Sequence, residues 1–164
     1  MKKGILLICT LLITGLFATT ATADEVRQAG YHCHPDSTSF YYWDVYLSRM
    51  TNNSSSTKYL SCPVIGVNIQ NYLYGTVYVI DHSPSPVYCS LGLTSTTGYT
   101  PGGGGVYYGT RSSSGDSSTV QTLSFSNGIT ALGLTPAMDC QVPGKDSSGN
   151  QSGIATYSTY SSQY

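Results

Sequence analysis

Short segments in which apolar and polar residues alternate make up most of the chain beyond its N-terminal apolar run. In the segment 118–126, Leu123 and Phe125 fall on one side of an extended strand, and hydroxyl residues fall on the other. This is the pattern of a strand with one buried face. No later window carries a sustained helical stripe, because clusters of Gly, Pro, Ser or Asn interrupt each stretch. The pattern therefore predicts an all-β protein.

Eight segments are predicted to form strands, with residues typical of turns between them. In the segment 75–83, Val77 and Val79 alternate with further apolar residues, which predicts a central strand with both faces covered. The segments lie too close together for helices between them, which excludes an α/β fold. We therefore expect an antiparallel β-sandwich, with a jelly-roll arrangement as one form of it. The eight segments are 39–47, 57–64, 75–83, 86–93, 104–110, 118–126, 137–142 and 153–159.

The first 23 residues have the pattern of a secretory signal peptide. Two lysines precede an apolar run from Ile5 to Phe17, and Ala21-Thr22-Ala23 has the small-x-small form of a signal-peptidase site. The apolar run is interrupted by threonines and a glycine and is short for a bilayer, which needs roughly 20 residues. We expect a cleaved signal at 1–23, a single domain at 24–164 and no membrane insertion after cleavage. The expected location is extracellular, with the periplasm as the alternative.

The charge of the expected mature chain excludes two classes of partner. Cleavage removes two of the seven basic residues, which leaves five against eight acidic residues and a net charge of −3. No block of like charge is present, whereas a nucleic-acid-binding surface needs clustered Lys and Arg. We therefore expect neither nucleic-acid binding nor a basic membrane-binding face. An abundance of Ser, Thr, Asn, Gln and Tyr is typical of an exported β protein.

Four cysteines remain after cleavage, and an even number in an exported chain predicts two disulfides. Four cysteines allow three connectivities. We favour Cys33 with Cys62 and Cys89 with Cys140, because both members of the second pair lie in strand-like segments. Each bridge stabilises a fold by about 2–4 kcal/mol.

The segment 29–36, AGYHCHPD, raises the question of a metal site. On one strand His32 and His34 would point the same way, and Asp36 would add a third ligand of the kind that zinc accepts. The alternative is two surface histidines beside a disulfide. Oxygen-rich residues at 144–153 do not match the spacing of a calcium loop, so that segment is predicted to be a turn. We expect no cofactor.

Acid and hydroxyl residues suggest no catalytic centre. The adjacent Asp81, His82 and Ser83 cannot converge as a triad, since neighbours on a strand face opposite ways. Asp81 is predicted instead to cap the turn that follows its strand. An enzyme is therefore the less favoured reading, and its most specific form is a small metal-dependent hydrolase that uses His32, His34 and Asp36.

Aromatic residues are the main surface signal. One strand carries Tyr42, Trp43 and Tyr46, and a later one carries Tyr107 and Tyr108. Flat aromatic side chains give a large contact area at a small entropic cost, which suits stacking against a sugar or docking of a protein. The alternative is that tyrosine simply fits strands. These five residues are the predicted binding residues, and the expected partner is a glycan or a cell-surface protein; the oligomeric state stays open.

An ordered series of short motifs resembles a group of small secreted bacterial proteins, frequent in myxobacteria and similar soil bacteria, that have no assigned activity. The motifs are SCPV (61–64), TVYVIDHSPSPVYCSL (76–91), QTLSFS (121–126) and MDCQVP (138–143). The resemblance covers roughly Ser61 to Pro143 and implies a signal peptide followed by one β-sandwich. It implies no catalytic or binding residue, and the upstream HCHPD and the tail after Pro143 lie outside it. The sequence thus predicts a secreted, non-catalytic binding or structural module.

Overall fold

The computed structural model describes eleven strands and one 3₁₀ turn. The predicted signal peptide and Asp36 lie outside the described residues. Among the residues that it describes, no helix is long and apolar enough to cross a membrane. The described residues are 24–35, 42–46, 48–64, 72–94, 106–130 and 135–162.

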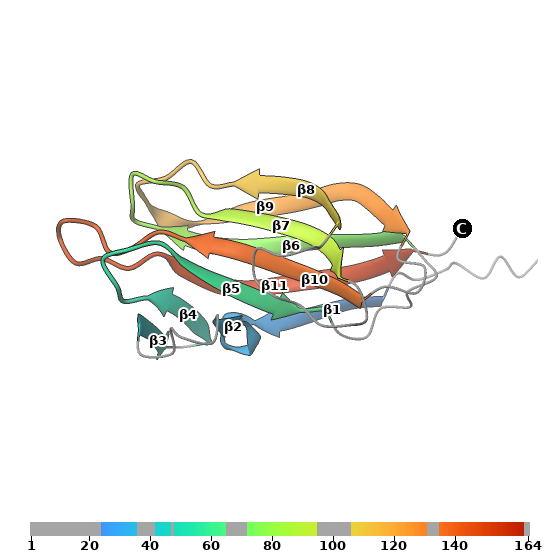
Figure 1. The fold of residues 1–164 in the computed structure, drawn as a ribbon, viewed down its shortest axis with the longest axis horizontal. Helices are drawn as coiled ribbons and strands as arrows, with labels where there is room; N and C mark the ends of the chain where they lie inside the picture. The colour runs from blue at the N-terminus through green and yellow to red at the C-terminus, as the bar shows by residue number, and fades with distance from the viewer. Residues whose placement is uncertain are drawn as a thin grey trace, which may run out of the picture.

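Two antiparallel sheets stack face to face, as Figure 1 shows. The first sheet has the order β3-β4-β11-β6-β9, and β1 also pairs with β11. The second sheet has the order β2-β5-β10-β7-β8. The first sheet comprises β1 (Asp24–Ala29), β3 (Trp43–Tyr46), β4 (Arg49–Asn52), β6 (Tyr72–Asp81), β9 (Ser117–Thr130) and β11 (Gly153–Ser162). The second comprises β2 (His34–Pro35), β5 (Lys58–Pro63), β7 (Tyr88–Thr94), β8 (Val106–Ser112) and β10 (Thr135–Val142), and the 3₁₀ turn η1 (Gly30–His32) precedes β2.

The predicted fold class is confirmed, and each of the eight predicted segments overlaps a strand. Three further strands, β1, β2 and β4, were not predicted. In β4 the inward-facing residues are Met50 and Asn52. Because Asn52 is polar, the sequence of β4 does not show the alternation of apolar and polar residues that would predict a strand. Strand β2 has only two residues, and β1 is mostly polar. Strands this short or polar carry no periodic apolar signal.

The core lies between the two sheets and is formed by the inward residues of each strand. Val77 and Val79 of β6 are fully buried, and Leu123 and Phe125 of β9 are 4% exposed. Strand β6 pairs with β11 on one side and β9 on the other, which confirms its predicted central position. Burial of apolar surface at about 25 cal/mol per Å² is the main stabilising contribution to such a core.

Both disulfides have the favoured pairing. Cys33, which follows η1, is bonded to Cys62 of β5, and Cys89 of β7 is bonded to Cys140 of β10. Cys89 and Cys140 are also direct partners in the β7–β10 register. All four cysteines are buried. The bridges therefore hold η1 to the second sheet and join two of its central strands.

Buried polar side chains fix the ends of strands. Asn52, which is fully buried, donates from Nδ2 to the carbonyls of Ser56, Val142 and Pro143. Its Oδ1 accepts from the backbone N–H of Ser54 at 2.9 Å. Because a buried amide is tolerated only when its hydrogen bonds are made, Asn52 ties the end of β4 to the loop after β10. This contact supports the β3–β4 hairpin.

Tyr157 joins the two sheets and has a pKa raised above the ordinary 10.0 by burial. Its single O–H proton is shared between Gln28 Oε1 at 2.7 Å and the Pro63 carbonyl oxygen at 3.0 Å, which both accept. Because the folded state keeps the phenol neutral, its contribution to stability is complete below pH 10 and is lost as the pH rises above that value, where the unfolded chain ionises.

Stability is therefore expected to fall more steeply above pH 10 in the wild type than in Tyr157→Phe, which has no group to ionise at this position. Urea unfolding at a series of pH values from 8 upward through 10 measures the free energy of unfolding of both proteins as a function of pH. If the free energy of unfolding falls equally steeply with pH in both proteins, ionisation of the Tyr157 phenol is not the cause of the alkaline loss of stability.

Candidate functional site

The outer face of the second sheet carries two exposed tyrosines in one row. Tyr59 of β5 and Tyr88 of β7 both pair with Gln141 of β10, which lies between them. Tyr59 is 43% exposed and Tyr88 is 44% exposed, and their chain neighbours Leu60 and Cys89 are buried. Since side chains alternate between the faces of a strand, all three residues of this tyrosine row point away from the core.

The tyrosine row has dimensions and chemistry suited to an extended polar ligand. Neighbouring strands lie about 4.8 Å apart, so the backbones of Tyr59 and Tyr88 lie about 10 Å apart. Gln141 lies between the two tyrosines in the register and is exposed. In the next row, the hydroxyls of Ser90 and Thr110 lie 3.0 Å apart. The tyrosine row thus combines two flat apolar rings with an amide, and the next row adds hydroxyls and the carboxyl group of Asp139, which pairs with Ser90.

Tyr42, which directly precedes β3, and Trp43, its first residue, behave differently from one another. Tyr42 is 45% exposed, and the Lys58 ammonium lies 4.3 Å from the centre of its ring. Trp43 is 8% exposed and belongs to the core. The expectation that Trp43 is an exposed binding residue is therefore wrong, because packing between the two sheets places the indole in the core.

The remaining predicted aromatic residues are described only through their backbones. Tyr46 pairs with Arg49 across the β3–β4 hairpin, and Tyr107 of β8 pairs with Gly92 of β7. Tyr108 follows in β8. The side chains of these three tyrosines lie outside the described residues, so their role in binding stays a prediction.

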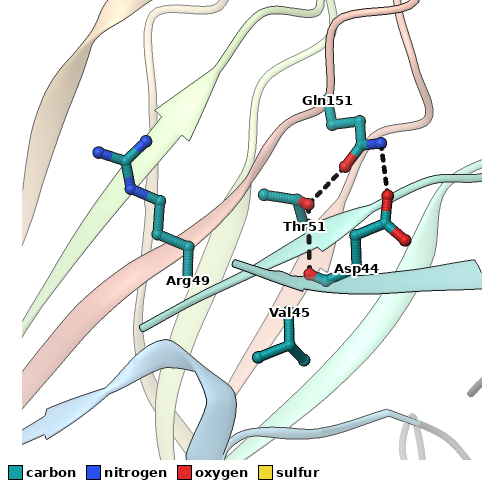
Figure 2. Close-up of a pocket in the computed structure, with 5 residues that line it drawn as sticks. All are labelled: Asp44, Val45, Arg49, Thr51 and Gln151. Carbon is teal, nitrogen blue, oxygen red and sulfur yellow. Dashed lines mark hydrogen bonds between the residues drawn. The ribbon is translucent and has the colours of Figure 1, made fainter. Parts of the chain in front are cut away.

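A pocket of about 520 Å³ lies beside the β3–β4 hairpin, and we call it the hairpin pocket. It lies where β3 and β4 meet the start of β11, and Figure 2 shows its lining side chains. Gln151 donates from Nε2 to Asp44 Oδ2 at 2.8 Å, and its Oε1 accepts from the Thr51 hydroxyl. Ser48, with a φ of 70°, turns the chain between the two strands. The lining residues are Asp44, Val45, Arg49, Thr51 and Gln151.

The predicted metal ligands His32 and His34 do not share a strand. His32 ends η1 and His34 begins β2, so the expectation that one strand aims both rings the same way is wrong. Both side chains are exposed, and Cys33 between them is in a disulfide. Within the described part of the chain, no three His, Cys, Asp or Glu residues are grouped to hold a metal ion. With Asp36 outside the described residues, that site stays a prediction.

The loop 144–153 is a closed turn, as the sequence predicted. Asp146 Oδ1 accepts from the backbone N–H groups of Ser148 and Asn150, each at 2.8 Å. Its Oδ2 accepts from the Asn150 side-chain amide at 2.7 Å, and this bond is the main reason that the pKa of Asp146 lies below its usual value. The chain itself uses both carboxylate oxygens, so the donor set does not fit a calcium loop.

Sequence reasoning missed the tyrosine row and the hairpin pocket. Alternation in 57–64 and 86–93 could have placed Tyr59 and Tyr88 on an outer face, because apolar residues occupy the positions between. It could not have shown that Gln141 separates them, since the register joins strands far apart in the chain. The pocket likewise joins β3 and β4 to Gln151, which is 107 residues beyond Asp44.

No family model and no curated protein matches this sequence. Solved structures with a similar fold include two carbohydrate-binding modules. The first is the CBM36-1 domain of a multidomain xylanase from the hindgut metagenome of Trinervitermes trinervoides, with 11% identity, a TM-score of 0.51, and coverage of 86% of this chain and 99% of that one. The second is the carbohydrate-binding module CBM36 in complex with calcium and xylotriose, with 14% identity, a TM-score of 0.50, and coverage of 83% and 99%. At these identities the likeness shows a shared β-sandwich fold.

Proposed function

We propose that this protein is a secreted, non-catalytic carbohydrate-binding module whose ligand stacks on the tyrosine row. The observation that carries the proposal is the register of Tyr59, Gln141 and Tyr88 on one outer face of the sandwich. Two exposed rings about two strand spacings apart suit consecutive or alternate sugar rings of one chain. Gln141 between them suits a hydrogen bond to a sugar hydroxyl.

The physical chemistry of the row favours a neutral sugar chain over a protein partner. The axial C–H groups of a pyranose form an apolar face that packs against a tyrosine ring, while its hydroxyls need donors and acceptors at the edge. The three residues of the row provide both and are uncharged, and among the described residues the one carboxyl residue beside them is Asp139 in the next row. A cell-surface protein is the alternative partner, and it would bury a larger apolar patch than two rings provide.

The fold likeness and the covalent chemistry support the same proposal. The two similar solved structures are carbohydrate-binding modules by their descriptions, and one holds xylotriose. Two disulfides suit an oxidising compartment, which agrees with the predicted signal peptide. We also propose that the protein is secreted and that it is related to the small secreted bacterial β-sandwich proteins that its motifs resemble. Xylan-type chains are therefore the first ligands to test.

Wild-type protein is expected to bind xylo- or cello-oligosaccharides, and Tyr59→Ala with Tyr88→Ala is expected to weaken binding about tenfold or more, because both stacking faces are lost. Isothermal titration with soluble hexasaccharides and depletion from solution by insoluble polysaccharide measure the effect. Tyr59→Phe and Tyr88→Phe keep the rings and should bind nearly as the wild type does. Tyr31→Ala removes a tyrosine that is 45% exposed but outside the row, and should have no effect.

Two outcomes would contradict this proposal. Equal binding by the wild type and the double alanine variant would remove the row from the site. Release of reducing ends from a bound glycan, abolished by a chelator, would favour the metal-dependent hydrolase that uses His32, His34 and Asp36.

A further inference from the structure

Arg49 lines the hairpin pocket without a partner among the residues that the structure describes. The other two arginines of the described chain are both engaged. Arg27 pairs with Glu25 at 3.2 Å, and Arg111 donates to the backbone carbonyls of Ser124 and Thr110. Figure 2 shows the Arg49 side chain extended along one side of the pocket, away from Asp44. A guanidinium with its donors unused at the edge of a pocket is suited to an anion from solution.

The opposite side of the pocket is already ordered by hydrogen bonds. Gln151 is held at both ends of its amide, since its Nε2 donates to Asp44 and its Oε1 accepts from Thr51. The Thr51 hydroxyl also lies 3.3 Å from the Asp44 carbonyl. This arrangement leaves one N–H of Gln151 and Asp44 Oδ1 without a hydrogen bond to any described residue. Those two groups suit a hydroxyl, which can donate to one and accept from the other.

The register sets the distance between the two sides. Asp44 lies opposite Thr51, and Arg49 is two residues from Thr51 along β4. Asp44 and Arg49 are therefore diagonal neighbours, about 7–8 Å apart between backbones. No ion pair joins them. A ligand that uses both must carry an anionic group at one end and hydroxyls at the other.

We propose that the hairpin pocket binds a uronic acid residue of an acidic glycan. The carboxylate accepts two hydrogen bonds from the Arg49 guanidinium, and hydroxyls on the far edge of the ring bond to Asp44 Oδ1 and the free Gln151 N–H. The volume of about 520 Å³ suits a sugar residue. A free amino acid fits less well, because its opposite charges sit on adjacent carbons and cannot span the pocket.

The proposal for the hairpin pocket rests on the proposed function in one respect, that the protein binds glycans. The hairpin pocket lies apart from the tyrosine row and would bind a different sugar. The test is isothermal titration of the mature chain with trigalacturonate, with sodium glucuronate and with the methyl ester of trigalacturonate. We expect binding of the acids and not of the ester. Arg49→Gln should weaken binding about tenfold or more, since a charge-assisted bidentate contact is lost.

Two variants serve as controls. Arg27→Gln removes an equal charge on β1 and should bind the acids as the wild type does. The double variant of Tyr59 and Tyr88 to Ala should keep uronate binding while losing neutral glycans.

The inference is overturned if neither acid binds, if the ester binds equally well, or if Arg49→Gln and Arg27→Gln behave alike. Loss of uronate binding in the double tyrosine variant would also overturn it, because the row would then hold the acid. The wild type could also bind uronate but no neutral glycan, with uronate binding lost in Arg49→Gln. That result would support the hairpin pocket as a uronate site and would contradict the proposed role of the tyrosine row.

Discussion

Replacing Asp81 by Ala is expected to lower the free energy of unfolding by about 3–4 kcal/mol, because four hydrogen bonds to this buried carboxylate are lost and the relief of its desolvation cost offsets only part of that loss. Asp81 is fully buried at the end of β6. Its Oδ1 accepts from Ser83 N at 3.2 Å and from the Ser152 hydroxyl at 3.0 Å. Its Oδ2 accepts from Val87 N at 3.1 Å and from the Ser113 hydroxyl.

These bonds hold three connections at one end of the sandwich. Ser83 and Val87 belong to the β6–β7 connection, Ser113 to the β8–β9 turn, and Ser152 directly precedes β11. Figure 1 shows the three connections gathered at the left end of the molecule. Alanine would leave the Ser83 N–H without its acceptor in a buried site, where an unmade hydrogen bond costs about 1–3 kcal/mol. The prediction that Asp81 caps the turn after its strand is confirmed, and Asp81 also binds the β8–β9 turn and the residue before β11.

Urea unfolding followed by circular dichroism measures this effect. Asp81→Asn should also destabilise, because the site presents four donors and an asparagine amide adds a fifth. Asp116→Asn is the matched control, since Asp116 is exposed and has a φ of 43°, which asparagine tolerates. A midpoint for Asp81→Ala equal to that of Asp116→Asn would contradict the structural role of the carboxylate.

Removing the Cys89–Cys140 bridge by a double change to Ala is expected to destabilise the protein by about 4 kcal/mol, on the chain-entropy model for its loop. The cysteines are 51 residues apart, and both are buried in the second sheet. A single domain of this size has only about 5–15 kcal/mol in total. Loss of the bridge should therefore bring the midpoint of thermal unfolding down steeply.

The Cys33–Cys62 pair provides the comparison. These cysteines are 29 residues apart, so the same model gives a slightly smaller loss, about 3.6 kcal/mol. Peptide mapping of the unreduced protein first checks the pairing, and thermal unfolding of both double variants then measures the losses. Mixed connectivity in the map, or no change in stability in either variant, would contradict the assignment.

Sequence patterning determined the features that depend on neighbouring residues. Alternation placed Leu123 and Phe125 in the core and located eight of the strands, because a strand reports its buried face through every second residue. Asp81 was read as a turn cap from its place between a strand and a Pro-rich loop. Four cysteines in a chain with a predicted signal peptide indicated two disulfides, although the pairing was a preference among three.

Tertiary structure alone decided which residues meet across the sheets. Tyr59, Gln141 and Tyr88 form one row only because β5 and β7 flank β10, and Gln151 reaches Asp44 only because β11 pairs with β4. Trp43 shows the same limit, since its pattern fits either face of β3 until packing against the core selects one. Strand order and register are set by contacts between residues far apart in the chain. The local pattern of apolar and polar residues therefore does not predict those contacts.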